Sequence, residues 1–203
     1  MINRLLSEIR NELNEFIKVK DPTNFGTQDI VVLSNLVDQN GTLAFTTSNN
    51  SQSEHKIVIT LVNVEEDRIF KDQTNFKKTA QDSIISLNPE IHINLSILFT
   101  AYSTSYDTAL LILGYVIGFF QMKNVFNPQN TPALNGVVEN ALLILETLSA
   151  EQNNHLWGYI GAKYMPSVVY RIKMLTVQEG QLQAEGPPIT KIMEKFEEKN
   201  NQA

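Results

Sequence analysis

Hydrophobic residues near the start of the chain recur every three or four positions. The apolar positions are Ile2, Leu5, Leu6, Ile9, Leu13, Phe16 and Ile17. This spacing places them on one face of a helix, whereas the residues between them are mostly polar or charged. Residues 20–26 then contain a proline and a glycine, which cannot continue the pattern. The sequence therefore predicts an amphipathic helix followed by a break.

Three later stretches have patterns typical of β-strands. Residues 29–37 are a first candidate, and residues 55–70 are rich in β-branched side chains. Residues 90–102 alternate almost strictly, which predicts a half-buried strand. One face of that strand carries Ile91, Ile93, Leu95, Ile97 and Phe99. The polar residues 38–53 show no packing face of their own, and residues 71–83 are interpreted as a loop.

The middle of the chain predicts a helix and then an ambiguous segment. Residues 103–122 are apolar at helical length, with Ser105 or a neighbour as the N-cap. After a turn rich in proline and asparagine, residues 136–148 fit either a strand or a helix by pattern alone. We favour a strand over residues 141–147, because the residues that follow carry a helix-start signature.

That signature is a capping box formed by Ser149 and Gln152, which predicts a short helix ending near Gly161. Pro166 then stops the helix, and residues 167–178 alternate as a strand. The order of elements predicts an α+β fold in which helices pack on a mostly antiparallel sheet. There are no internal repeats.

The helix that precedes that last strand contains the single tryptophan, Trp157. Its large ring is expected to be buried where the helix meets the sheet, with Gly158 and Gly161 permitting close backbone approach. Together with Pro166, these residues are interpreted as a structural corner. Gly114 and Gly118 are expected to allow close packing of their helix on the sheet, because that helix is too short for membrane dimerisation.

The charge and the cysteine content of the chain exclude several classes of protein and of site. The 203 residues carry a formal net charge of −6, which argues against a general nucleic-acid binder. The absence of cysteine excludes disulfides, thiolate nucleophiles and cysteine-based zinc sites. The most apolar run, residues 109–120, falls short of the roughly 20 residues that cross a bilayer, so we expect a buried helix and no membrane span.

The acidic end of the second predicted strand is the main candidate for a polar site. It consists of Glu65, Glu66, Asp67 and Arg68. Acid–base catalysis would require one carboxyl group there to be buried with a raised pKa, whereas the simpler interpretation is a solvated end of a strand. A third interpretation is an interface, in which Arg68 and these acids pair across a subunit boundary.

No other motif predicts chemistry. The histidines His55, His92 and His155 fall in three different elements, without a carboxylate at ligand spacing, so no metal site is predicted. Phosphate-binding glycine loops and a nucleophile elbow are also missing from the sequence. We therefore predict no enzyme activity, no catalytic residue and no cofactor.

Three long segments resemble a known family. They are residues 58–72, which contain NVEE, residues 89–132, which contain NLSILFTAY and FFQ, and residues 148–175, which contain LWGYIGAKYMPSVVY. In this order they are similar to the tube-terminator, or cap, proteins of extracellular contractile injection systems. These are phage-tail-like particles of the antifeeding-prophage and Photorhabdus virulence-cassette type. The resemblance covers residues 1–178, and residues 179–203 are interpreted as a linker and a short C-terminal helix or arm.

The resemblance implies a fold similar to phage tail-terminator proteins and a structural role. The chain would form a homo-hexameric ring on the last layer of the inner tube, end tube growth and contact the end of the sheath. Its implied partners are the inner tube protein, the sheath protein and a further cap paralogue, without nucleic acid. It would act in the bacterial cytoplasm during assembly and then as part of a cytoplasmic or released particle.

Two alternatives stay open on the sequence alone. A tail-completion protein of an intact contractile-tailed phage would share this architecture but should line its ring with basic residues, since DNA must pass. A small cytosolic ligand-binding or hydrolase domain would instead place a polar pocket near Trp157 and His155.

Overall fold

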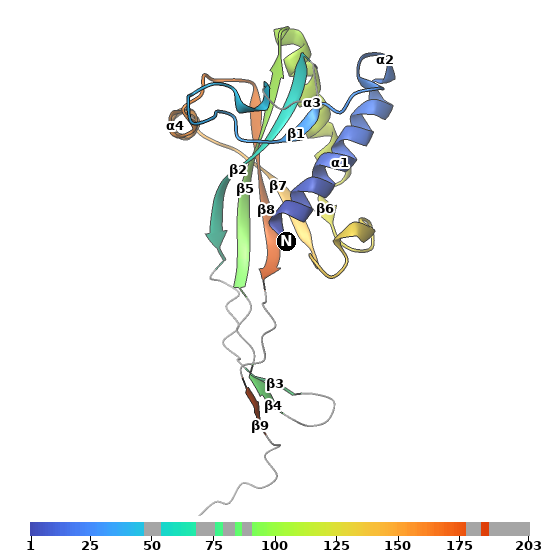
Figure 1. Ribbon diagram of the computed structural model, residues 1–203, viewed down its shortest axis with the longest axis vertical. Helices are drawn as coiled ribbons and strands as arrows, with labels where there is room; N and C mark the ends of the chain where they lie inside the picture. Colours follow the sequence, from blue (N-terminus) through green and yellow to red (C-terminus); the bar gives the residue numbers. More distant parts are fainter. Residues whose placement is uncertain (47–53, 68–75, 79–83, 87–90, 178–183, 187–203) are drawn as a thin grey trace, which may run out of the picture. The chain divides into compact units, whose positions relative to one another are not determined.

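The computed structural model describes residues 1–46, 54–67, 76–78, 84–86, 91–177 and 184–186 (Figure 1). The chain divides into two units. The first comprises Met1–Phe70 and His92–Val177, and the second comprises Lys71–Ile91 and Gln178–Ala203. The first unit contains all the described helices. Among the described residues, no helix combines the length and the apolar character that crossing a membrane requires.

The predicted N-terminal helix is confirmed as α1, Ile2–Lys20. Its apolar positions Leu5, Ile9, Leu13 and Ile17 are buried, while its last turn carries Lys18 and Lys20, which suit the negative end of a helix dipole. The break is a short second helix, α2, Pro22–Phe25, whose N-cap Asp21 accepts a hydrogen bond from the backbone of Asn24.

The first unit is built on a six-stranded sheet with the order β1-β2-β5-β8-β7-β6. The strands are β1 Val31–Leu33, β2 His55–Glu66, β5 Ile91–Ser103, β6 Val125–Phe126, β7 Ala141–Glu146 and β8 Ser167–Val177. The pairs β2–β5, β6–β7 and β7–β8 are antiparallel, whereas β1 pairs with β2 in parallel. The predicted α+β class is confirmed, with a mixed sheet.

Alternation along the strands gives the sheet two apolar faces. On β5, Leu95, Ile97 and Phe99 join the larger core, whereas Leu98 joins a second, smaller core. The larger core lies under α1 and α3, Tyr106–Met122, as the packing of their buried residues shows. The smaller core packs under α4, Ala150–Ile160, and the 3-10 turn η1, Ala44–Thr46. Figure 1 shows α1 and α4 on different sides of the strands.

The predicted capping box is confirmed at the start of α4. The Ser149 hydroxyl accepts a hydrogen bond from the Gln152 backbone, and the Gln152 side chain accepts one from the Ser149 backbone. The helix ends at Gly161, whose φ of 74° lies in the left-handed region that favours glycine. The strand predicted over residues 141–147 is confirmed as β7.

Other sequence expectations differ from the structure. The first strand is only three residues long, and the two-residue strand β6 and the 3-10 turn η2, Pro132–Leu134, were not expected. The expectation that residues 38–53 have no packing face is wrong, because Phe45 is buried in the smaller core. The buried ammonium group of Lys56 donates to the Phe45 carbonyl at 2.9 Å, which fixes this segment to β2. Residues 47–53 lie outside the described part.

The second unit contains a three-stranded antiparallel sheet in the order β3-β4-β9. Its strands are β3 Phe76–Lys78, β4 Ile84–Ser86 and β9 Ala184–Gly186. Strand β3 lies within the predicted loop, and β9 lies within the predicted linker. Pairing between distant segments thus forms strands where local pattern indicates none. The C-terminal helix predicted after this strand falls outside the described residues.

Candidate assembly surfaces

Helix α3 is apolar on the side that faces away from the sheet as well as on the buried side. Its inner residues are Ala109, Ile112, Val116, Phe119 and Phe120. On the outer side, Tyr106, Leu110, Leu111, Ile117 and Met122 are between 39% and 69% exposed. We call these five residues, with Gly114 and Gly118, the α3 outer face. A helix that is apolar all round is normally covered on both sides.

Both glycines of α3 lie on this outer face. A Cβ atom placed on either Gly114 or Gly118 would meet no atom of the chain within 4 Å, and both residues are exposed. The expectation that they allow close packing of the helix on the sheet is therefore wrong. The two positions instead leave bare backbone between the exposed side chains of Leu110, Leu111 and Ile117.

A groove of about 470 Å³ adjoins the α3 outer face where α3 passes α1. Its apolar lining comes from Phe16, Val19, Phe119 and Met122, and the rings of Phe16 and Phe119 lie 5.4 Å apart. Val19 is 81% exposed. At its rim, the Lys123 ammonium group lies 2.6 Å from the Glu12 carboxylate. The groove adjoins the outer face at Met122, which belongs to both.

At the end of β2, the candidate polar site forms ion pairs with other strands of the same chain. Glu65 lies 3.3 Å from Arg171 of β8, which also binds Glu146 of β7 at 2.7 Å. The hydrogen bond to Glu146 is the main cause that raises the pKa of Arg171. Glu65 thus has a partner in its own chain, on strands that sequence analysis did not connect with it.

The neighbours of Glu65 make separate contacts. The Asp67 carboxylate accepts a hydrogen bond from the Asn94 side chain at 3.3 Å, and the Asp67 backbone donates to the His92 carbonyl. Glu66 is exposed, and Arg68 lies outside the described residues. Pairing of these residues across a subunit boundary stays a prediction.

The corner around Trp157 belongs to the smaller core. Its ring is buried with Val58, Leu98 and Val169, and it meets Tyr164 edge-on at 5.4 Å. Pro166 lies just before β8, and its carbonyl accepts a hydrogen bond from the Ala101 backbone at 2.9 Å. At both Gly158 and Gly161, however, an added Cβ would meet nothing within 4 Å, so the close backbone approach expected at these two glycines does not exist.

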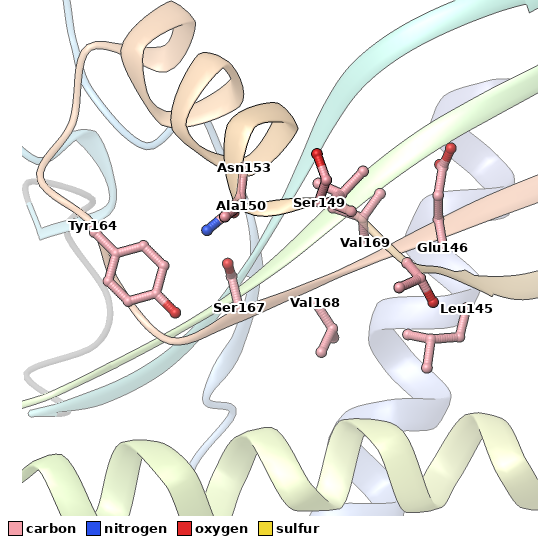
Figure 2. A pocket seen from close by; sticks show the side chains of 11 residues that line it. Leu145, Glu146, Ser149, Ala150, Asn153, Tyr164, Ser167, Val168 and Val169 are labelled. Atoms are coloured by element: carbon pink, nitrogen blue, oxygen red, sulfur yellow. The ribbon is translucent and has the colours of Figure 1, made fainter.

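A second groove, of about 310 Å³, lies where β7 leaves β8 and leads into α4 (Figure 2). Its lining includes Glu146, Ser149, Tyr164 and Ser167. Figure 2 shows Leu145 and Val168 on the side of their strands that faces α3. The single carboxylate in the lining, that of Glu146, is bound to Arg171. These lining residues include no histidine or lysine that would act as a base.

The histidines lie apart from the grooves described above. His155 is exposed on α4, and the imidazole of His55 on β2 lies 2.7 Å from the Ser103 hydroxyl. His92 lies on β5. Within the described ranges, no three His, Cys, Asp or Glu side chains are grouped so that they would hold a metal ion.

The α3 outer face was missed by sequence analysis, although a signal was available. Between Asp107 and Lys123 the helix carries no charged residue, so its pattern lacks the polar stripe of a helix that faces water. On the sequence alone, that pattern predicts complete burial within the chain. The alternative, burial against another molecule, produces the same sequence pattern.

Both the sequence and the fold of this chain are similar to those of known proteins. The model of the protein family described as the Pvc16 N-terminal domain matches residues 4–191. No curated protein sequence matches the chain. Among solved structures, the fold is similar to the sheath/tube terminator of the PVC extracellular contractile injection system in its extended state, with a TM-score of 0.59 and 13% identity. The match covers 94% of this chain and 64% of that one.

A second similar structure is the tube-terminating cap of the anti-feeding prophage. Its TM-score is 0.55 at 13% identity, and the match covers 93% of this chain and 60% of that chain. At this identity the likeness shows a common fold. The chain thus spans less than two thirds of the length of either terminator.

Proposed function

Because the chain belongs to the family described as the Pvc16 N-terminal domain, we propose that it caps the inner tube of a contractile, phage-tail-like injection system. One observation carries this proposal: the fold of both tube terminators extends over more than nine tenths of the chain. The family resemblance found in the sequence points the same way. The proposed role is structural, with no bond made or broken.

In this proposal six copies form a ring on the last layer of the tube. A closed ring requires an interface in which two different surfaces of each copy meet, because a contact between identical surfaces produces only pairs. One face of the ring would contact the tube and stop its growth, and the outer edge would contact the last sheath layer. Within the particle, the partners of this chain would thus be the tube protein, the sheath protein and a paralogous cap.

The surfaces of the first unit support such a role. This unit has two hydrophobic cores, and one of its helices, α3, exposes apolar side chains. A permanent protein–protein contact needs an apolar surface of this kind. The described grooves hold no base paired with a nucleophile, and His155 is exposed away from them. These features favour an assembly protein over a ligand-binding or hydrolase domain.

Deletion of the gene tests this proposal through the length of the tubes. Without a terminator, tube growth has no end point, so particles purified from the deletion strain are expected to show a broad range of tube lengths under the electron microscope. Expression of the chain from a plasmid should restore a single length. A length distribution unchanged by the deletion would contradict the proposal, and particles filled with DNA would indicate an intact phage instead.

A further inference from the structure

Two asparagines of the chain, Asn40 and Asn135, are directly followed by glycine, and both Asn-Gly pairs are exposed. Asparagine is a chemically labile residue, and it reacts most readily before glycine, which has no side chain to hinder attack by its own backbone nitrogen. The two pairs have the same chemistry but different hydrogen bonds. We therefore expect them to react at different rates in the folded chain.

The reaction is a deamidation, in which a side-chain amide becomes an acid. The backbone nitrogen of the glycine loses its proton and bonds to the Cγ atom of the asparagine. The bond from Cγ to the side-chain nitrogen breaks, and that nitrogen takes up a proton and leaves as ammonia. Water then opens the resulting succinimide ring at either of its two carbonyl groups. The products are aspartate and isoaspartate, and water is the single co-reactant.

The attacking nitrogen is free at Asn135. Residues 134–137 form a type II turn, in which Asn135 has a φ of −57° and a ψ of 130° and Gly136 has a φ of 70°. The turn is closed by the Val137 backbone N–H, which donates to the Leu134 carbonyl at 2.9 Å. Gly136 is the third residue of the turn, so its N–H takes no part in this bond. Among the described residues, the Gly136 N–H has no hydrogen-bond partner.

The corresponding nitrogen is engaged at Asn40. Gly41 is the fourth residue of its turn, and its N–H donates to the Asp38 carbonyl at 3.1 Å. The Asp38 carboxylate accepts hydrogen bonds from the backbone of Asn40 at 2.8 Å and from the backbone and the hydroxyl of Thr42 at 2.9 and 2.7 Å. Ring closure at Asn40 has to break bonds of this set. Within the part of the chain that the structure describes, no side chain holds the turn at Asn135 in this way.

The charge of Asp38 adds to the difference. The hydrogen bond from the Thr42 side chain is the main cause that lowers the pKa of Asp38, so this carboxylate is negative at neutral pH. The Gly41 nitrogen becomes negative when it loses its proton. A negative neighbour disfavours that state, because like charges repel. Asp38 thus opposes the reaction at Asn40 both by hydrogen bonding and by charge.

We propose that Asn135 is a site of spontaneous deamidation and that Asp38 protects Asn40 from the same reaction. Isoaspartate at position 135 places one more carbon atom in the backbone of a turn whose neighbours, Leu134 and Val138, are buried in the larger core. Modified chains are therefore expected to pack less well between η2 and β7. This chemistry takes place in the chain alone, so it does not depend on the proposed cap function.

Incubation of the purified chain at mildly alkaline pH, followed by digestion and mass spectrometry, measures the two rates. Chromatography separates the peptides that contain asparagine, aspartate and isoaspartate. Asn135 is expected to react at least about fivefold faster than Asn40, which is the factor that corresponds to one net hydrogen bond on the Gly41 nitrogen. Equal rates, a faster reaction at Asn40 or no reaction at Asn135 would overturn the proposal.

The unfolded chain is the first control. In guanidinium chloride both turns are lost, so the two asparagines should react at similar rates. If Asn135 kept the same advantage there, neighbouring sequence and not the turns would set the rates, and the proposal would be wrong. This comparison needs no variant, so it does not depend on the folding of any altered chain.

The variant Asp38→Ala is the second control, because it removes the acceptor of the three side-chain bonds and the negative charge. The reaction at Asn40 is expected to accelerate severalfold in this variant, while the rate at Asn135 stays that of the parent chain. An unchanged rate at Asn40 in the folded variant would show that Asp38 does not protect it.

Discussion

Replacement of Phe99 by alanine is expected to lower the free energy of unfolding by about 3–5 kcal/mol. Phe99 is completely buried at the centre of β5, where its ring lies 5.0 Å from that of Phe120 on α3 and 5.7 Å from that of Tyr170 on β8. Alanine removes the whole ring from a site where helix and sheet meet, and the rigid surroundings leave a cavity. Urea denaturation of the purified variant measures the loss.

This change is large because domains of this size are stable by only about 5–15 kcal/mol. Tyr159→Ala is the control, since its side chain is 81% exposed and its removal should alter stability by no more than about 0.5 kcal/mol. A loss of less than about 1 kcal/mol for Phe99→Ala would mean that the ring is not packed between α3 and the sheet as described.

Replacement of Asn14 by alanine should cost about 2–3 kcal/mol of stability, although the residue is polar. Asn14 is buried on α1, and its side chain accepts a hydrogen bond from the Val31 backbone N–H at 2.9 Å and donates one to the Val31 carbonyl at 3.2 Å. These two bonds connect the helix to the edge strand β1. Alanine leaves both backbone groups of Val31 buried without this partner.

Two further variants separate the lost hydrogen bonds from the lost volume. Asn14→Leu keeps the size of the side chain, so a similar loss of stability is expected if the hydrogen bonds are the cause. Asn11→Ala, on the exposed side of the same helix, should change stability little. Amide exchange at Val31 should accelerate in both Asn14 variants. If Asn14→Leu proved as stable as the parent chain, the two bonds would not hold β1 in place.

Local signals in the sequence predicted most of the long elements. The period of two along β5 and the capping box at Ser149 are properties of neighbouring residues, so pattern alone is sufficient to find them. Short strands are different: β6, of two residues, exists because it pairs with Ala141 and Leu142. Such strands depend on contacts that no local window contains.

The polar contacts and the exposed surface were harder to predict for the same reason. Glu65 and Arg171 are separated by 106 residues in sequence, and a charged residue carries no sign of which distant partner it meets. Burial of Phe45 depends on Lys56 and on the smaller core. For α3, the apolar pattern indicates that the helix is covered, but not whether its own sheet or another molecule covers it.

The family resemblance read from residues 58–72, 89–132 and 148–175 is confirmed by the match of the family model to residues 4–191. Those segments correspond to β2, to β5 with α3, and to α4 with β8, which are the frame of the first unit. Their side chains fill the two cores, so the resemblance identifies the fold. The candidate assembly surfaces lie on the exposed sides of the same elements.

Electron microscopy of the purified chain mixed with preassembled inner tubes tests the central claim most directly. The account predicts a ring of six copies at one end of each tube, and no further growth at that end when tube subunits are added. Tubes that keep growing at both ends at an unchanged rate, with no added density on either, would contradict it.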